Sequence, residues 1–460
     1  MPIAKRLTIA DLFRNRRGTL LYRFIIVFFG VALKVFFRRI ETVSAENVPS
    51  GTGVIFVMNH PNGLIDPALV FASLPRRISF LAKSTLFRMP VIGFILRAIG
   101  ALPLYRRIDA GEDVSKNQRT FELCREWLRD GGSIALFPEG ISHNSPKLLP
   151  LKSGASRIAI GAASVSNGAE TVIVKIIPVG LYYTNKTTFR SEALLHFGEP
   201  FEVEPVSLDE DGRPPRDAVK TLTSLIDAGL RDVTLNAENE AELHAARIAE
   251  EIFAAAQSEQ SLGREFEFRK EFLKETTDDV NVDADENLKL RLRKFDARLD
   301  QLRLEPEHLS LALYSRISVT REAFYYAWKF VLLAPFAFIG AMLHFPAYQM
   351  ITLFSKWYAS HGADDAASTA KVLAGVVFMP LTWIIAAAIV YYFWRSWLAL
   401  AVIPVSFLLG YAALYTLEEF AEARGWARAI RLFLTEREKF LRLFVERREI
   451  QNALQKPARE

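Results

Sequence analysis

The sequence predicts an α/β domain with a charged helical insert and a C-terminal transmembrane helical region. Three observations support this fold class. Short β-rich apolar runs alternate with helical periodicity from Gly51 to Val203, residues 206–310 are polar and helical in pattern, and three uncharged stretches lie near the C-terminus. With 460 residues and 50% hydrophobic side chains, the chain is too apolar to be disordered. The predicted segments are 1–45, 46–205, 206–320, 321–418 and 419–460.

The first segment, 1–45, is predicted to form basic amphipathic helices that anchor in the membrane interface. Residues 1–40 carry nine Lys or Arg and one acid, Asp11. The apolar run Phe24–Leu33 has ten residues, which is too short to span a bilayer comfortably. A signal peptide is the alternative, but no small-residue cleavage site follows Leu33. Anionic lipid headgroups are therefore the expected partners of this segment.

The second segment, 46–205, alternates strands with helices. Strands are predicted at Val54–Met58, Ile78–Ala82, Leu102–Tyr105, Ser133–Phe137 and Thr171–Val179. Helices are predicted at Pro67–Leu74, Ser84–Ile99, Val114–Arg129 and Ser153–Ser164, the third of them capped by Gly131-Gly132.

The sharpest motif follows the first of these strands. It reads Asn59-His60-Pro61-Asn62-Gly63-Leu64-Ile65-Asp66. A histidine at a strand end lies at the rim of the sheet, where open α/β folds place their sites. Asp66 can bond one imidazole nitrogen of His60, which leaves the other nitrogen free to take a proton. The alternative is structural, with Asp66-Pro67 as a helix start and His60 as a turn residue.

Three weaker features also lie at strand ends, and each alone has a plain structural explanation. Pro138-Glu139-Gly140 presents a carboxylate and backbone N–H groups, although a tight turn with a solvated Glu is commoner. Arg106 suits phosphate through its bidentate fork, but a lone exposed Arg is usually solvated. Pro178 suggests a strand broken at the edge of a pocket, with an edge strand as the simpler explanation.

In this order and within about 120 residues, the four features resemble the four motifs of the glycerolipid acyltransferases. That family comprises glycerol-3-phosphate and 1-acylglycerol-3-phosphate acyltransferases. Ala82-Lys83 and Leu151-Lys152-Ser153-Gly154-Ala155 also resemble its pattern. The resemblance covers residues 50–205, and the C-terminal hydrophobic region is similar to that of a branch with dual-substrate members.

Two departures from the family pattern concern the site. Five residues separate His60 from Asp66 where the common motif has four, and Gly63 is expected to let the extra residue bulge. Ile141-Ser142-His143 follows the Glu-Gly pair where many members carry Thr-Arg. That loss weakens the inference of acceptor-phosphate binding at this turn.

The resemblance implies transfer of a fatty acyl chain from a thioester, acyl-CoA or acyl-carrier protein, to a hydroxyl of glycerol 3-phosphate or lysophosphatidate. It implies a mixed sheet flanked by helices, with His60 as general base oriented by Asp66 and no further cofactor. The expected substrate-binding residues are Lys83, Arg106, Glu139, Gly140 and Pro178, with Asn59 and Pro138 supporting the motifs. The alternatives are the same chemistry on another lysolipid or an amino-acid lipid, and a catalytically inactive membrane scaffold.

No metal is predicted, because the other histidines show no ligand spacing. Cys124, the single cysteine, falls inside a predicted helix and is expected in the core rather than at a nucleophile turn.

Segment 206–320 is predicted to be a helical hairpin or bundle. Its two short heptad seams are Ala241, Ala245, Ile248, Ile252, Ala255 and Leu288, Leu292, Phe295, Leu299, Leu302.

The apolar stretches of segment 321–418 are Phe330–Phe354, Val372–Trp394 and Trp397–Tyr415, of 25, 23 and 19 residues. Each can span a bilayer, which predicts an integral membrane protein. The positive-inside rule places the catalytic domain and the basic tail 419–460 in the cytoplasm, which requires an even number of crossings. Either one stretch is re-entrant, or the first, interrupted by Pro335 and Pro346, does not cross simply. Nucleic acid is not an expected partner, because the positive charge lies beside apolar helices.

Overall fold

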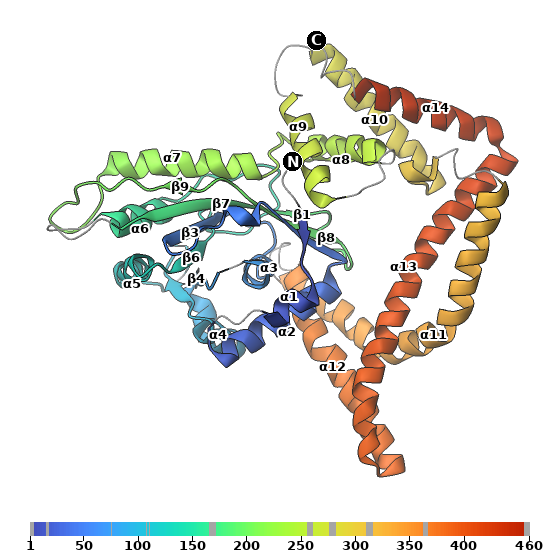
Figure 1. Cartoon of the computed structure of the whole chain (residues 1–460), viewed down its shortest axis with the longest axis horizontal. Coiled ribbons are helices and arrows are strands. Elements are labelled where there is room, and N and C mark those ends of the chain that lie inside the picture. Colours follow the sequence, from blue (N-terminus) through green and yellow to red (C-terminus); the bar gives the residue numbers. More distant parts are fainter. Residues whose placement is uncertain are drawn as a thin grey trace. The chain divides into compact units, whose positions relative to one another are not determined.

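The computed structural model describes residues 4–14, 18–74, 76–106, 108–109, 111–164, 172–254, 261–275, 282–309, 316–361 and 367–454 (Figure 1). The chain divides into two compact units. The first comprises Met1–Glu238, Ser261–Phe266 and Gly362–Val372, and the second comprises Asn239–Gln260, Glu267–His361 and Leu373–Glu460.

Strands of the first unit form one mixed sheet, which confirms the predicted fold class. The strands are β1 (Ala4–Arg6), β2 (Arg39–Val43), β3 (Gly53–Met58), β4 (Ser79–Lys83), β5 (Leu102–Leu104), β6 (Ser133–Leu136), β7 (Val174–Tyr183), β8 (Glu192–Phe197) and β9 (Phe201–Glu202). Their order is β1-β2-β8-β7-β3-β6-β4-β5, with β9 also paired to β7. The strands β7, β3, β6, β4 and β5 run parallel, whereas β8 and β9 pair with β7 antiparallel. The parallel part buries every residue of β3 and β6, as expected when helices cover both faces.

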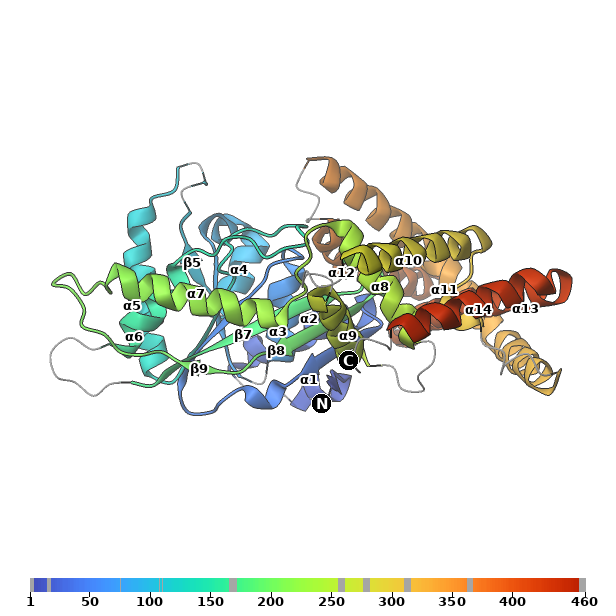
Figure 2. The same cartoon turned by 90° about the horizontal axis from the view of Figure 1, so that it is seen from above.

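Helices cover both faces of this sheet (Figures 1 and 2). They are α1 (Ile9–Arg14), α2 (Leu20–Phe36), α3 (Ile65–Ser73), α4 (Pro90–Ala98), α5 (Asn117–Arg129), α6 (Gly154–Ala163) and α7 (Arg216–Val233). On one side, α5, α6 and α7 share a buried apolar cluster with β3, β6 and β7, which includes Cys124. On the other side, α2 packs against α3, where the Tyr22 and Phe71 rings lie 4.9 Å apart.

Most of the predicted elements of this unit are present, with differences that have local causes. The helix predicted over Ser84–Ile99 is a 3-10 turn, Ser84–Arg88, followed by α4, because Pro90 disfavours a helical conformation at Met89. At the end of α5, Gly131 takes a φ of 74° and donates its N–H to the carbonyl of Leu128, which confirms the predicted cap. The prediction did not include β1, β2, β8 and β9, and Thr171, the predicted start of one strand, lies outside the described residues.

The boundary expected at residue 206 differs from the structure. Helix α7 buries Val219, Leu222, Ile226 and Leu230 against the sheet cluster, so it belongs to the first unit, which runs to Glu238. At the other end, β2 joins the sheet and starts at Arg39, inside the segment predicted to be an N-terminal anchor.

The second unit is helical. Its helices are α8 (Glu240–Ala254), most of α9 (Leu262–Glu275), α10 (Val282–Leu302), α11 (Arg316–His361), most of α12 (Ala367–Trp394), α13 (Val402–Thr435) and α14 (Arg437–Leu454). Helix α8 contacts α10, and the seam residues Ile248, Leu292 and Phe295 are almost fully buried, whereas Ala241 at the start of its seam is exposed. The tail helix α14 completes this bundle by contacting both. Ala255, and residues 276–281 in the acidic link, lie outside the described residues.

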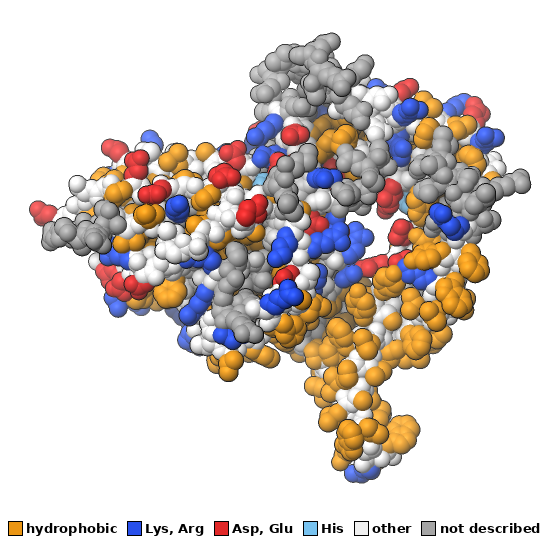
Figure 3. Space-filling model, viewed as in Figure 1, with side chains coloured by type: hydrophobic (Ala, Val, Ile, Leu, Met, Phe, Trp, Pro, Cys, Tyr) orange, Lys and Arg blue, Asp and Glu red, His pale blue; other side chains and the backbone are white. Residues whose placement is uncertain are grey.

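Three helices are long and apolar enough to cross a membrane among the residues the structure describes. They cover Phe324–Tyr358, Thr369–Trp394 and Trp397–Thr435. Hydrophobic side chains cover their exposed surfaces (Figure 3). Helix α11 continues through Pro335 and Pro346, so these prolines do not divide it into separate helices. It packs against α13, where a Cβ on Gly340 would lie 2.0 Å from the Leu409 carbonyl oxygen. Only glycine therefore fits at this approach.

Candidate active site

The predicted motifs converge on one edge of the sheet. Asn59 and His60 follow β3, Glu139 follows β6 after Phe137 and Pro138, and Arg106 follows β5. Because β3, β6, β4 and β5 are parallel neighbours, the ends of all four strands, including Lys83 at the end of β4, meet at the carboxyl edge. This is the edge at which open α/β sheets carry their sites.

A histidine–aspartate pair lies at the end of β3. Nδ1 of His60 is 2.8 Å from Oδ2 of Asp66, and since a carboxylate accepts, Nδ1 carries the hydrogen. The Asp66 side chain is fully buried, whereas the His60 side chain is 18% exposed. The His60 ring stacks on Phe137, with centroids 4.0 Å apart. Nε2 of His60 makes no hydrogen bond among the described residues, so it is free to accept a proton from a ligand.

Two further donors hold the Asp66 carboxylate. The backbone N–H of Asn62 donates to Oδ2 at 2.7 Å, and the Tyr183 hydroxyl donates to Oδ1 at 2.6 Å. Burial, together with the Asp66 charge, raises the pKa of Tyr183 well above its ordinary value, so this hydroxyl stays a donor. Tyr183 was not predicted as a site residue. It lies five residues beyond Pro178 on β7, and no signal in the sequence singles it out.

The extra residue between His60 and Asp66 is accommodated at Gly63. Its φ is +46°, in the left-handed region that glycine adopts at no steric cost. The Ile65 N–H donates to the Asn62 carbonyl at 3.0 Å, which closes the loop tightly. The bulge expected from the spacing is therefore present, and the carboxylate still reaches the imidazole.

Glu139 differs from the expectation of a carboxylate presented to substrate. It is only 3% exposed and accepts hydrogen bonds from the His60 N–H at 3.0 Å and from the Leu149 N–H at 2.8 Å. Its other partner is Nε2 of His143. All of these donors come from the protein, and through the first of them the carboxylate holds the backbone of His60.

His143 stands three positions after Gly140, in the turn that lacks the family's Thr-Arg pair. Its Nδ1 accepts from the Ser145 N–H at 3.1 Å, which leaves the hydrogen on Nε2 for Glu139. Its own backbone N–H donates to the His60 carbonyl at 3.2 Å. Both ring nitrogens are therefore occupied, and His143 is a structural member of the site that the sequence did not reveal.

The two predicted cations share one carboxylate. Arg106 forms a fork with Asp109 at 2.9 and 3.1 Å, and Nζ of Lys83 lies 2.9 Å from the same carboxylate. These hydrogen bonds, that from Arg106 first, lower the pKa of Asp109 to about 2, so the carboxylate is charged at neutral pH. Arg106 also donates to the Gly140 carbonyl at 2.8 Å, which connects the group to the Glu139 turn.

A third cation lies over that turn. A Cβ on Gly140 would stand 2.5 Å from Nζ of Lys152, so the lysine side chain covers the glycine directly. Among the described residues, its Nζ has no ion-pair partner, in contrast to Lys83 and Arg106. Lys152 lies in the Leu151-Lys152-Ser153-Gly154-Ala155 pattern, which resembles the family pattern. This resemblance could have identified Lys152 as a candidate site residue.

Asn59 and Pro178 contact other parts of the protein. Asn59 binds both backbone groups of Leu181 on β7, at 3.0 and 2.7 Å. Pro178 does not break a strand, because β7 runs unbroken from Val174 to Tyr183 between β3 and β8, and Pro178 is buried in it. On one side of β7, the pairing with β9 ends at Ile176 and the pairing with β8 starts at Val179. Pro178 lies between these two pairings, so its lack of an N–H removes no hydrogen bond to either strand. Its ring lies against Gly198 and Gly229 of α7.

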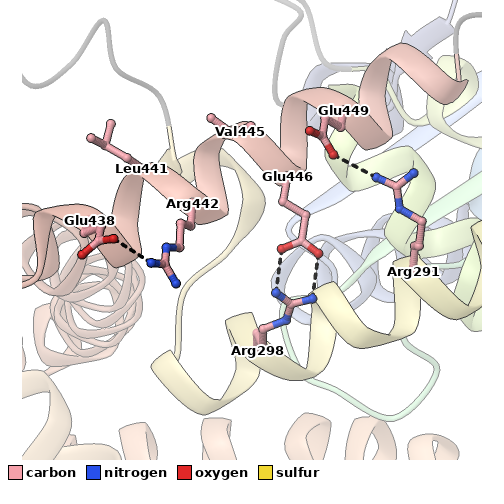
Figure 4. Close-up of a pocket in the computed structure, with 8 residues that line it drawn as sticks. All are labelled: Arg291, Arg298, Glu438, Leu441, Arg442, Val445, Glu446 and Glu449. Carbon is pink, nitrogen blue, oxygen red and sulfur yellow. Dashed lines mark hydrogen bonds and ion pairs between the residues drawn. The ribbon is translucent and has the colours of Figure 1, made fainter.

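Two surface hollows lie elsewhere. One, between α10 and α14 in the second unit, is lined by Arg291, Arg298, Glu438, Leu441, Arg442, Val445, Glu446 and Glu449 (Figure 4). Its arginines are paired, with Arg298 forming a fork on Glu446 at 2.7 and 2.8 Å. The other is lined by Arg76, Arg77, Trp127, Asp130, Gly131, Gly132 and Ser133. Neither is lined by a residue of the four predicted motifs.

Known proteins match the part of the chain that carries this edge. Residues 39–182 match the family described as Acyltransferase, so this stretch is an acyltransferase domain. Curated relatives include glycerol-3-phosphate O-acyltransferase 2 of Saccharomyces cerevisiae, 25% identical over 58% of this chain and 37% of that protein. A chloroplastic 1-acyl-sn-glycerol-3-phosphate acyltransferase of Brassica napus is 31% identical over 35% of this chain and 43% of its own. These matches confirm the resemblance to the glycerolipid acyltransferases that the motifs indicated.

The coverage of these relatives is partial. Glycerol-3-phosphate O-acyltransferase 1 of S. cerevisiae is 24% identical over 78% of this chain, which spans 60% of that protein. A solved 1-acyl-sn-glycerophosphate acyltransferase from Thermotoga maritima is 20% identical, covering 49% of this chain and 86% of that one, with a TM-score of 0.35. The strand order given above, and not this structural match, defines the fold.

Proposed function

We propose that this chain transfers a fatty acyl group from a thioester donor to a hydroxyl of glycerol 3-phosphate or lysophosphatidate. The observation that carries the proposal is the His60–Asp66 pair, with a 2.8 Å contact to a fully buried carboxylate and a free Nε2 at the carboxyl edge of an acyltransferase domain. The relatives carry the names of enzymes for both acceptors, which supports this substrate class.

The geometry supports a base role for His60. Nε2 takes the proton of the acceptor hydroxyl as its oxygen attacks the thioester carbonyl carbon, and the Nδ1–H bond to Asp66 stabilises the imidazolium that forms. When the tetrahedral intermediate collapses, the carbon–sulfur bond breaks and the thiolate takes the proton back from Nε2. The products are the ester and the free thiol, and His60 returns to its starting form. No acyl-enzyme and no metal or cofactor enters these steps.

The acceptor phosphate would bind beside the Glu139–Gly140 turn. Lys83 and Arg106 lie there, but both are paired with Asp109. Lys152 over Gly140 has no such partner among the described residues and would supply positive charge at the turn where many family members carry Thr-Arg. The group of three cations and one carboxylate retains a net positive charge, which favours an anionic acceptor.

A second acceptor class is favoured by one specific observation. Because Asp109 neutralises part of the charge of Lys83 and Arg106, another lysolipid or an amino-acid lipid is the alternative acceptor. The base chemistry at His60 would be the same for all of these hydroxyls.

A membrane location fits the product of either reaction, which is a lipid. The three apolar helices support integral membrane attachment, and exposed Leu20, Phe24 and Phe28 on α2 support an additional interfacial contact with anionic lipid. By the positive-inside rule, the basic residues of the chain support a cytoplasmic location for the catalytic domain. Acyl-CoA or acyl-carrier protein, both cytoplasmic, would then reach the site directly.

An acceptor screen tests the proposal. Purified full-length protein in phospholipid nanodiscs is given labelled acyl-CoA or acyl-carrier protein with glycerol 3-phosphate, lysophosphatidate, a neutral monoacylglycerol or an amino-acid lipid. We expect product with the two phosphorylated acceptors and a KM for glycerol 3-phosphate raised about tenfold by Arg106→Ala. Product only with neutral acceptors, unaffected by Arg106→Ala, would support the alternative. No product with any acceptor would refute an acyltransferase.

A further inference from the structure

The loop that carries His60 and Asp66 ends at α3, and this helix has no local side-chain cap. Leu64 occupies the N-cap position and has no polar side-chain atom. The N–H of Leu64 instead donates to Oγ1 of Thr369 at 3.2 Å, a residue 305 positions later in the chain. A helix start without a partner for its N–H groups is unfavourable, so this distant hydroxyl takes the place of a cap.

The start of α12 is fixed at this position by more than one contact. Residues 367–372 belong to the same compact unit as the sheet. Thr369 and Ala370 are buried, at 7% and 2% exposure. Nζ of Lys371 donates to the Thr187 carbonyl at 2.8 Å, and the neighbouring carbonyl of Lys186 accepts from the Asn62 side chain at 3.3 Å. The same short segment therefore contacts the loop after β7 and the loop after β3.

We propose that Thr369 is a positioning residue for catalysis and that the start of a candidate membrane helix completes the active-site loop. Thr369 fixes Leu64, Leu64 begins α3, and Asp66 in the first turn of α3 fixes the tautomer and ring of His60. Thr369 touches neither substrate nor the reacting atoms. It is also the first residue of the candidate span Thr369–Trp394, which ties the catalytic loop to the point where that helix begins. This inference rests on the proposed function at the same site.

The hydroxyl, and not the size of the side chain, carries this role. Valine has the same shape as threonine without an acceptor, whereas serine keeps the acceptor. Thr382 offers a matched control, because it lies in α12 too and its Oγ1 donates to the Phe378 carbonyl of its own helix at 2.9 Å. Thr382→Val therefore removes a hydroxyl from the same helix without removing a contact to the His60–Asp66 loop.

The first measurement is kinetic. Full-length Thr369→Val, Thr369→Ser and Thr382→Val are assayed in nanodiscs with labelled acyl-CoA and the acceptor that the wild type uses. We expect kcat of Thr369→Val to fall about tenfold or more, because a misplaced catalytic group loses rate without losing binding. The KM values for both substrates should stay within about twofold, Thr369→Ser should recover most of kcat, and Thr382→Val should match the wild type.

The second measurement needs no activity. Hydrogen exchange by mass spectrometry follows the peptide that covers residues 62–68 in the same proteins. We expect about fivefold faster exchange in Thr369→Val and protection close to wild type in Thr369→Ser and Thr382→Val. Unchanged exchange and unchanged kcat in Thr369→Val would overturn the inference, as would a loss that Thr382→Val reproduces. If the wild type transfers no acyl group, the proposed function is refuted. The exchange experiment still tests the hydrogen bond from Leu64 to Thr369, and unchanged exchange in Thr369→Val would refute its role in the loop.

Discussion

Asp66→Asn is the substitution whose effect can be worked out most fully from the structure. An asparagine has one oxygen and one NH2 group in place of two carboxylate oxygens. The Asn62 N–H points at Oδ2 from 2.7 Å, so only the amide oxygen fits there, and it also accepts from Nδ1 of His60 as before. The NH2 group then faces the Tyr183 hydroxyl, which can rotate to accept. The imidazole therefore keeps its tautomer and its position and loses only the negative charge beside it.

The cost follows from the lost charge. The imidazolium that forms in the reaction has its charge spread over the ring, at about 4 Å from the carboxylate, where two unit charges interact with about 4 kcal/mol at an effective dielectric constant of about 20. At 1.36 kcal/mol per decade, this corresponds to a loss of about 10³ in kcat. Since Asp66 is fully buried and does not reach the substrate, KM should stay nearly constant.

The assay is initial-rate kinetics with labelled acyl-CoA on Asp66→Asn and on the control Asp227→Asn. Asp227 is paired with Arg231 on α7 and lies outside the site, so its substitution should leave kcat unchanged. A kcat of Asp66→Asn within threefold of wild type would refute the electrostatic role assigned to the buried carboxylate.

Three further outcomes are expected. Tyr183→Phe removes one of the three donors to Asp66 and should lower kcat about tenfold at constant KM; an unchanged kcat would mean that the other two donors suffice. Lys152→Met should raise the KM for glycerol 3-phosphate about tenfold and leave that for the acyl donor unchanged, whereas equal changes in both would contradict a specific role in acceptor binding. Burial raises the pKa of Cys124 to about 12, so the reactive thiolate is scarce and the folded protein should resist a maleimide at pH 8 until it is unfolded; rapid labelling of the native protein would contradict this.

The sequence allowed the site to be located but not all of its supports to be found. His60, Arg106 and Glu139 follow apolar strands, and parallel strands bring their carboxyl ends together, so their convergence was predictable from local patterns. Tyr183 and Thr369 could not be found this way. Each contacts the His60–Asp66 loop only because of pairing over 117 and 305 residues, and nothing local distinguishes either residue from an ordinary buried side chain.

The sequence predicted where Glu139 and Pro178 lie along the strands better than it predicted what they contact. Glu139 and Pro178 were expected at a substrate pocket, because charged and breaking residues at strand ends are usually exposed. The hydrogen-bond donors to Glu139 depend on which segments lie beside it in the fold. The gap between β8 and β9 beside Pro178 depends on which strands pair with β7. The periodicity of a single strand does not reveal its neighbours. In the heptad seams, by contrast, the middle positions are buried as local spacing predicts, whereas Ala241 is exposed. The contact of α14 with the same helices was not predicted.

The most direct test of the account is product formation by His60→Ala compared with His244→Ala. His244 also pairs with an aspartate, with Nε2 at 3.0 Å from Asp296, but it lies in the helical unit and is 44% exposed. With glycerol 3-phosphate and labelled acyl-CoA, the wild type and His244→Ala should form lysophosphatidate at equal rates, and His60→Ala should form none above the uncatalysed background. Retention of acyl transfer by His60→Ala would contradict the assignment of His60 as the base.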